Sequence, residues 1–297
     1  MTRENRPQMD ANRSAADDPL AAALDWACAQ PGSWHDSGNL NAEVLRAIVH
    51  HAARVGAGET AETGCGLSTV LLSNIAECHT CFTIAAGNSL ALVQNVRYLR
   101  RDRVNFVIGP SQATVPRHCF TRPLDFVLVD GPHGFPFPQL EYYFFYPRLR
   151  RGGILVIDDI HIPTIRQMYE VLRDDRMWLH VEDVLTTAFF QRTAAPVFDP
   201  YGDGWERQQF NQRHFGNPTL MDLYCPDWRE AMPPPPGSLP GTAATAAGHR
   251  PGTEPPAVAA MRDELALLRQ ENAAMRSSTS WRMTAPLRGL ASRLLNR

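Results

Sequence analysis

Two apolar segments that read as buried strands, Phe126–Val129 and Ile154–Ile157, each run directly into carboxylates followed by a histidine. The side chains that could take part in catalysis or metal binding are Asp130 with His133, and Asp158 and Asp159 with His161. Carboxylates gathered at one sheet edge repel one another unless a cation lies among them, and such oxygen ligands suit Mg²⁺ or Mn²⁺. A histidine nearby could take a proton from a substrate. The alternatives are a helix cap for each acid and a structural role for each histidine.

A second group surrounds a glycine turn within Thr60–Leu72. An acid, Gly64-Cys65-Gly66, a small polar pair and an apolar run follow one another there. This order predicts a strand, a tight turn and a helix whose first N–H groups face an anionic ligand. Because Gly-x-Gly also occurs in ordinary turns, the interpretation depends on the elements around it.

Alternating strands and helices must position these side chains. The predicted strands cover residues 59–63, 80–85, 104–109, 124–130 and 153–158, with helices near 67–77, 88–100, 136–149 and 162–174. Residues 178–184 and 186–192 read as an antiparallel hairpin. We therefore expect an α/β fold: a Rossmann-like, doubly wound, mainly parallel seven-stranded sheet with an antiparallel closing hairpin, plus a C-terminal helical tail. In such a sheet, ligands bind at the carboxyl ends of the strands.

The composition of the chain excludes some classes of partner and of catalytic group. The 297-residue chain has a net charge of −2, which gives no case for a nucleic acid partner, and all 29 of its basic residues are arginine, which excludes a catalytic lysine. Cys78 and Cys81 form an isolated CxxC with no second pair to complete a zinc site, so we expect free thiols. We find no apolar leader and no spanning segment, and expect a cytoplasmic protein.

The composition divides the chain into five parts. They are a disordered N-terminus (1–17), a catalytic domain (18–229), a Pro/Ala/Gly-rich linker (230–256), a short coiled-coil helix (257–276) and a basic amphipathic tail (277–297). Apolar spacing over 258–276 predicts a parallel homodimer, with a solvated single helix as the alternative. The tail suits either a membrane surface, to which the protein would attach peripherally, or a partner protein. Segment 193–229 is either a lid or a packed extension.

Residues 41–192 resemble class I S-adenosylmethionine-dependent methyltransferases. The resemblance rests on Glu62-Thr63-Gly64-Cys65-Gly66, on the strand order and on Gly152-Gly153 before the fifth strand. Within that superfamily, Asp130 with Asp158-Asp159 looks like the metal triad of the macrocin-type sugar O-methyltransferases, and the cephalosporin-hydroxylase-like group is similar in layout. Residues 278–288 resemble tails of bacterial polysaccharide-assembly proteins.

The resemblance implies S-adenosylmethionine as cofactor. The residues expected around it are Glu62, Thr63, Gly64, Cys65, Gly66, Ser68, Thr69, Asn88, Ser111, Gln112 and Asp130. Glu62 would bind the ammonium group of the cofactor or shape the loop, and Ser111 with Gln112 would contact the adenine or cap a helix. The family's ribose-binding acid is missing from the end of the second strand. Either Asn88 replaces it, or the cofactor lies differently, or activity is lost.

The implied reaction is methyl transfer to a sugar or glycan hydroxyl. A divalent metal, with Mg²⁺ as first choice, would be held by Asp130, Asp158 and Asp159 and would lower the pKa of that hydroxyl. His133 is the first choice for the base and His161 the second, with Asp130 beside them. Aromatic residues would wall the acceptor site or belong to the core: Phe135, Phe137, Tyr142 and Tyr143.

Two other functions remain open at this stage. A non-catalytic assembly protein of a polysaccharide machinery would keep the fold and recruit partners through residues 258–297, and the missing ribose acid supports it. An NAD(P)-dependent oxidoreductase would need a third glycine where Thr69 stands and an acid after the second strand.

Overall fold

The computed structural model describes residues 18–36, 38–200, 202, 204–217, 221–222 and 226–227. The chain divides into two compact units, residues 1–215 and 216–297, and the elements named below belong to the first. The predicted disordered N-terminus, linker, coiled coil and tail lie outside the described residues. The predicted end of the catalytic domain at residue 229 stays a prediction.

A seven-stranded sheet forms the centre of the first unit. Its strands are β1 (Glu59–Thr63), β2 (Cys78–Thr83), β3 (Val104–Ile108), β4 (Leu124–Val129), β5 (Leu149–Ile157), β6 (Trp178–Val184) and β7 (Thr187–Arg192). They lie in the order β3-β2-β1-β4-β5-β7-β6, and the first five are parallel. Strand β7 is antiparallel to both β5 and β6. The predicted mainly parallel sheet with a closing hairpin is confirmed.

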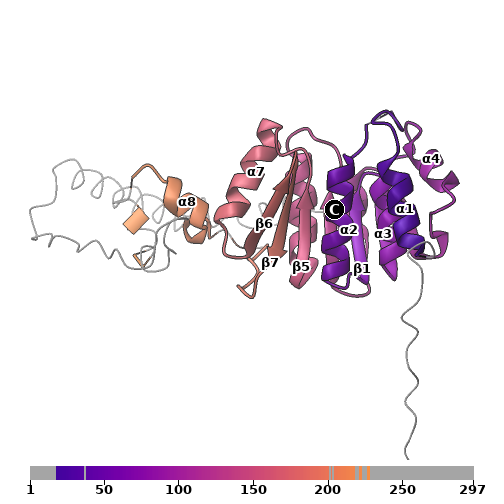
Figure 1. The fold of residues 1–297 in the computed structure, drawn as a ribbon. Coiled ribbons are helices and arrows are strands. Elements are labelled where there is room, and N and C mark those ends of the chain that lie inside the picture. Colours follow the sequence, from indigo (N-terminus) through magenta and orange to yellow (C-terminus); the bar gives the residue numbers. More distant parts are fainter. Residues whose placement is uncertain are drawn as a thin grey trace, which may run out of the picture. The chain divides into compact units, whose positions relative to one another are not determined.

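Helices cover both faces of this sheet. They are α1 (Pro19–Cys28), α2 (Ala42–Arg54), α3 (Leu67–Ile75), α4 (Ser89–Asn95), α5 (Ser111–Thr114), α6 (Phe137–Phe145), α7 (Pro163–Asp174) and α8 (Gln209–His214). Figure 1 shows α1, α2 and α3 together in front of the strands, and these three helices contact one another. Asp18 and Asn41 begin the first two helices, each accepting a hydrogen bond of 3.0 Å from the second helical N–H.

The period-two alternation of the strands separates two apolar cores. On the α2 side, the buried strand residues are Phe126, Leu128, Ile154, Val156 and Phe189. On the side of α6 and α7, they are Ala61, Phe82, Leu124, Val127, Val129, Leu155, Ile157, Ala188 and Phe190. Because apolar side chains of β4 and β5 point to both faces, these strands read as continuous hydrophobic runs in the sequence.

The strand order reverses between β1 and β4, which places a crevice at their carboxyl ends. Thr63 pairs with Val129 in this register, so the segments that follow the two strands begin side by side. The chemistry-bearing residues of both predicted groups are therefore delivered to one place on the sheet.

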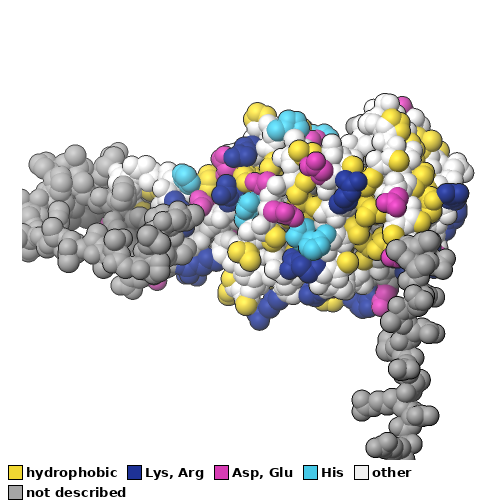
Figure 2. Space-filling view, viewed as in Figure 1, with side chains coloured by type: hydrophobic (Ala, Val, Ile, Leu, Met, Phe, Trp, Pro, Cys, Tyr) yellow, Lys and Arg dark blue, Asp and Glu magenta, His cyan; other side chains and the backbone are white. Residues whose placement is uncertain are grey.

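The surface charges and the cysteine thiols of the described residues do not point to a second site. Figure 2 shows described Arg side chains interspersed with Asp and Glu side chains over one face. Within the described residues, no helix combines the length and the apolar character needed to cross a membrane. Cys78 and Cys81 lie three residues apart on β2 and so point to opposite faces. The five described cysteines are free, as expected.

Candidate active site

Two glycines shape the turn between β1 and α3 in different ways. Gly64 has a φ of +90°, and a Cβ on it would overlap the backbone carbonyl oxygen of Asp130, after β4. Gly66 is extended, and a Cβ on it would lie 3.2 Å from Nε2 of His35. The turn therefore packs closely against the end of β4 on one side and approaches His35 on the other.

Buried hydrogen bonds hold this turn from the inside. Glu62 is only 1% exposed and accepts hydrogen bonds from Ser68 (2.7 Å), from Thr69 and from His79 (3.0 Å). The Thr69 hydroxyl also accepts a hydrogen bond of 3.0 Å from the N–H of Gly66. Of the two roles left open for Glu62, this network favours shaping the loop. A ligand would then meet the backbone of the turn, because these side chains face inward.

The sequence analysis missed Glu141 of α6, which is 1% exposed and lies among the predicted site residues. Its carboxylate accepts hydrogen bonds from Thr63 (2.8 Å) and Ser111 (2.5 Å). Thr63 in turn accepts one of 3.2 Å from the N–H of Asp130. Burial raises the pKa of Glu141 to about 7, although both hydroxyls favour its ionised form. Ser111 is thus bonded within the protein, and it is the first residue of α5 rather than its cap.

The predicted catalytic side chains come together at the ends of β4 and β5. Nε2 of His133 lies 3.2 Å from an oxygen of Asp159 and 3.7 Å from an oxygen of Asp130. Nδ1 of His161 lies 3.5 Å from the other oxygen of Asp159. The side chains of His133 and His161 are 45% and 60% exposed, so both rings can be reached by a ligand.

Asp158 and Asp159 are consecutive but meet different partners. Asp158 accepts a hydrogen bond from the hydroxyl of Thr187 on β7. Asp159 has a φ of +57°, a left-handed conformation that is uncommon outside glycine, and contacts both histidines. This local turn lets one acid anchor the strand end while the other enters the histidine cluster.

Burial and crowding change how these groups hold protons. Burial raises the pKa of Asp130 to about 7; the hydrogen bond from His133 opposes the rise, and the charges of Asp158 and Asp159 add to it. The Asp130 side chain keeps 28% of its surface exposed, so water moderates the effect. The hydrogen bond with Asp130 raises the pKa of His133. Each group thus favours the charged form of the other, the imidazolium of His133 and the carboxylate of Asp130.

The predicted metal ligands do not form a ligand set as their side chains stand. In the part of the chain that the structure describes, no group of three or more His, Cys, Asp or Glu side chains has the spacing to hold a metal ion. Asp158 is turned to Thr187 and Asp159 to the histidines. The three carboxylates are close enough to influence one another's charge, and nothing beyond that supports a metal.

The ends of β2 and β3 form the other side of the crevice. Ile84 and Ile108 are 53% and 56% exposed there and offer apolar surface to a flat ring. Gln112 is exposed in α5. Asn88 exchanges two hydrogen bonds with Asp36, a residue from the segment between α1 and α2. Asn88 thus has a partner that the sequence did not suggest, and its contact with the cofactor stays a prediction.

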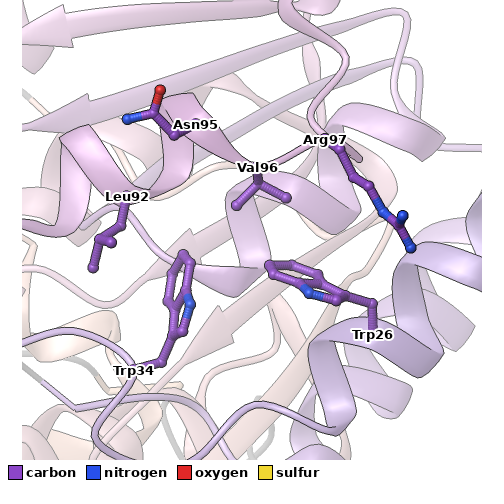
Figure 3. A pocket seen from close by; sticks show the side chains of 6 residues that line it. All are labelled: Trp26, Trp34, Leu92, Asn95, Val96 and Arg97. Atoms are coloured by element: carbon purple, nitrogen blue, oxygen red, sulfur yellow. The ribbon is translucent and has the colours of Figure 1, made fainter.

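A pocket of about 510 Å³ opens beside α1 and α4. Its lining residues are Trp26, Trp34, Leu92, Asn95, Val96 and Arg97. Figure 3 shows the two indole rings turned toward Val96, with the Arg97 and Asn95 side chains farther out. The rings meet edge to face with their centroids 5.9 Å apart. This packing holds Trp34, and with it the segment that carries His35 and Asp36.

The aromatic residues expected around the acceptor divide between core and surface. The hydroxyl of Tyr142 accepts a hydrogen bond of 3.1 Å from the indole of Trp178, and burial raises its pKa, so Tyr142 belongs to the core. Phe137 is half-buried, whereas Phe135 is 67% exposed. Tyr143 donates a hydrogen bond of 2.9 Å to the carbonyl oxygen of Pro200. Phe135 is therefore the candidate for an acceptor contact.

The described part of segment 193–215 packs against the domain. The hydroxyl of Tyr146 donates a hydrogen bond of 3.0 Å to the carbonyl oxygen of Phe198. Arg213 of α8 forms an ion pair with Asp174 at the end of α7. Up to residue 215, the segment is a packed extension rather than a free lid.

Comparison with known proteins now gives a family match. Residues 61–160, about a third of the chain, match a protein-family model described as Methyltransferase domain. No curated protein matches the chain. This stretch contains the glycine turn, Glu141 and the Asp130–His133–Asp159 cluster.

Several solved structures are similar in fold. Cofactor-bound Rv0187 from MTB is 18% identical with a TM-score of 0.45, covering 60% of this chain and 92% of that one. The O-methyltransferase TomG from Streptomyces achromogenes, involved in tomaymycin synthesis and solved with SAM, is 16% identical with a TM-score of 0.46, covering 60% and 91%. An O-methyltransferase from Bacillus cereus solved with SAH is 15% identical with a TM-score of 0.45, covering 59% and 91%.

The narrower resemblance to macrocin-type enzymes stays a prediction, as does that of the tail. The family match itself covers the residues from the end of β1 to the turn after β5, which are the residues that build the crevice. Residues 61–160 match the model of a methyltransferase domain, and the prediction of a methyltransferase enzyme is confirmed.

Proposed function

We propose that this protein is an S-adenosylmethionine-dependent O-methyltransferase that acts on a sugar hydroxyl. One observation carries the proposal: the glycine turn and the Asp130–His133–Asp159 cluster follow adjacent strands and touch through Gly64 and the Asp130 backbone. A methyl donor at the turn and a hydroxyl at the cluster would therefore be neighbours. Displacement at a methyl carbon needs that proximity and a defined alignment.

On the donor side, the backbone of Gly64-Cys65-Gly66 and the first turn of α3 would receive the methionine part of the cofactor. Ile84 and Ile108 would offer apolar surface to the adenine. The inward hydrogen bonds of Glu62 keep the turn in one conformation before the ligand arrives, which lowers the ordering cost of binding.

On the acceptor side, His133 would remove the proton of the attacking hydroxyl. Its Nε2 already lies within 3.2 Å of Asp159, which orients the ring and stabilises the imidazolium that forms. Asp130 lies 3.7 Å from the same ring and would stabilise the imidazolium until the proton passes to solvent. His161 contacts only the far oxygen of Asp159 and is the weaker candidate for the base.

A divalent metal is part of this proposal. Three carboxylates, Asp130, Asp158 and Asp159, have the oxygen chemistry that Mg²⁺ prefers, and the charges of Asp158 and Asp159 add to the burial that raises the pKa of Asp130. To hold the ion, Asp158 would have to leave Thr187 and Asp159 would have to leave the histidines. When bound, it would lower the pKa of the acceptor hydroxyl.

The surroundings of the cluster support a sugar as the acceptor. Phe135 exposes its ring two residues after His133, close in sequence to the carboxylates. An apolar ring face beside hydrogen-bonding groups suits a sugar, which has apolar C–H faces and hydroxyl edges. A role in bacterial polysaccharide or glycoside biosynthesis rests on the resemblance of the tail, which would recruit a membrane surface or a partner.

The structure weakens one alternative function. Thr69 stands where a dinucleotide-binding turn would have its third glycine, and its side chain is fully buried and hydrogen-bonded to Glu62. An oxidoreductase is therefore disfavoured. A non-catalytic assembly protein would not need a histidine held between two carboxylates.

Calorimetric titration of the full chain with S-adenosylhomocysteine, with and without Mg²⁺, tests the cofactor. Micromolar binding is expected, and no binding under either condition would refute the function. Transfer of a labelled methyl group from S-adenosylmethionine to a panel of sugars and glycosides then tests the acceptor. Full turnover in excess chelator would remove the metal from the proposal and leave the base mechanism.

A further inference from the structure

The end of β2 lacks an acid of its own but receives one from another segment. Residues Thr83–Asn88 contain no carboxylate. Asp36, from the connection between α1 and α2, accepts a hydrogen bond of 3.0 Å from the side-chain amide of Asn88. The N–H of Asp36 donates one of 3.2 Å to the Asn88 side-chain oxygen. A residue 52 positions earlier is thus fixed at the strand end by a reciprocal pair.

The Asn88 side chain is committed to this pair rather than to its own helix. Asn88 occupies the N-cap position of α4, where an asparagine side chain normally accepts a hydrogen bond from the helix. It makes no side-chain capping bond here. The amide that would stabilise α4 by about 1 kcal/mol holds Asp36 instead.

The segment 31–36 is itself well anchored. Trp34 packs edge to face on Trp26 of α1, and its N–H donates a hydrogen bond of 2.9 Å to the carbonyl oxygen of Pro31. His35 packs on the Trp34 ring and lies over Gly66. The segment therefore reaches the turn after β1 through His35 and the end of β2 through Asp36.

Only one oxygen of Asp36 is used in the pair with Asn88. Oδ1 accepts the amide hydrogen bond, and Oδ2 lies 4.0 Å from the position a Cβ would take on Gly87. The absence of a side chain at Gly87, whose φ is +77°, leaves space beside that oxygen. The carboxylate oxygen that is not part of the pair with Asn88 can accept a hydrogen bond from a hydroxyl of a diol.

We propose that Asp36 binds the ribose hydroxyls of the cofactor, and that segment 31–36 covers the cofactor from the β1 end to the β2 end. Because a ribose is present only if a nucleoside cofactor binds, the proposal rests on the function proposed above. It also explains how the chain manages without an acid on β2: the carboxylate comes from the connection before α2, and Asn88 positions it.

The test compares two ligands on the full chain by calorimetry: S-adenosylhomocysteine and its 2′,3′-dideoxyribose analogue. We expect Asp36→Ala to weaken S-adenosylhomocysteine binding roughly 10- to 100-fold, as for a lost hydrogen bond to a charged group, and to change binding of the analogue less than about threefold. Asn88→Ala should give a smaller loss with the same selectivity. Asp102→Asn, a matched acid before β3 that is 66% exposed, should change neither.

Two results would overturn the proposal. Unchanged binding of S-adenosylhomocysteine by Asp36→Ala would remove Asp36 from the site. An equal loss for both ligands would show that Asp36 merely holds the segment together. Failure of the unmodified protein to bind S-adenosylhomocysteine is a distinct result, because it would refute the function itself and this proposal with it.

Discussion

Strand β4 carries an aspartate near each end, and the two behave in opposite ways. At the start, Asp125 accepts hydrogen bonds of 2.8 Å from the N–H groups of Gly58 and Glu59 and one from Arg150. Burial alone would raise its pKa, but these donors lower it. After the other end, burial dominates at Asp130 and raises its pKa to about 7. Hydrogen-bond donors and Arg150 stabilise the carboxylate charge of Asp125 at the amino edge of the sheet, whereas burial disfavours the charge of Asp130 at the carboxyl edge.

This comparison shows that the carboxyl groups with raised pKa values lie at the carboxyl edge of the sheet. The amino edge ties strand ends and loops together, and the hydrogen bonds of Asp125 serve only that purpose. The carboxyl edge keeps two carboxyl groups with a pKa of about 7, Asp130 and Glu141, which costs stability that a purely structural edge would not lose. Substitutions at the two edges should therefore separate stability from activity.

The largest effect is expected from the two glycines that flank β1. Gly64→Ala places a Cβ against the Asp130 carbonyl at a φ of +90°, and we expect a loss of more than about 4 kcal/mol. Gly56→Ala, before the strand, has a φ of +60° and open space, and should lose about 1 kcal/mol. Urea unfolding of both variants measures the difference, and equal midpoints would contradict the tight packing of the turn on β4.

His133→Asn should come next, as a loss of rate instead of stability. Removal of the base is expected to lower kcat roughly 100- to 1,000-fold while leaving S-adenosylhomocysteine affinity unchanged. His50→Asn, an exposed histidine of α2, serves as the matched control. A rate within threefold of the unmodified protein would show that another group removes the proton.

Glu141→Gln should flatten the dependence of stability on pH. The folded protein keeps a proton on Glu141 up to about pH 7, whereas the unfolded chain releases it near the ordinary glutamate pKa of 4.5. Stability should therefore fall as pH rises through this window, by up to about 3 kcal/mol from this group alone. Urea midpoints between pH 5 and pH 8 measure the slope. Asp130 acts in the same direction, so some slope remains in the variant.

Two outcomes decide whether Glu141 behaves in this way. Glu170→Gln, an exposed glutamate of α7, should leave the slope of the unmodified protein intact. An identical slope in Glu141→Gln would mean that Thr63 and Ser111 keep Glu141 ionised in the folded state.

The smallest effect is expected at the amino edge, from Asp125→Asn. The amide can still accept the backbone hydrogen bonds, so we expect a loss of about 1–2 kcal/mol at pH 7 from the weakened pair with Arg150. Because the pKa of Asp125 is lowered in the folded protein, its stabilisation exists above the unfolded value and is lost as pH falls. The two proteins should converge in stability in acid, with kcat unchanged throughout. A lower kcat for Asp125→Asn without a loss of stability would contradict the purely structural role of the amino edge.

The sequence predicted the strands well because their signal is local. Apolar runs marked β4 and most of β5, but β5 begins at Leu149, earlier than the predicted residue 153. Residues Arg150–Gly153 carry no strand pattern of their own and lie in a register shift between the pairs Leu124–Leu149 and Phe126–Ile154, where Arg150 contacts Asp125. The short helix α5 was also missed, because four residues carry too little periodicity to detect.

The candidate site was predictable only where it lies directly after a strand. Asp130, Asp158, Asp159 and both histidines were found because they follow apolar runs, and the structure brings them together. Glu141 and Asp36 lie on a helix and on a connection, and only tertiary packing brings them to the crevice. No spacing in the sequence relates Asp36 to Asn88, so this pair could be seen only in three dimensions.

The pairing of Thr63 with Val129 has a consequence for protein engineering. The distance between the proposed donor turn and the proposed acceptor cluster is set by backbone hydrogen bonds of two neighbouring strands, not by side chains. Residues 134–137, which follow His133, could therefore be exchanged to recognise a different hydroxyl while the donor end keeps its geometry. In this fold, recognition of the acceptor and binding of the methyl donor would depend on different segments of the chain.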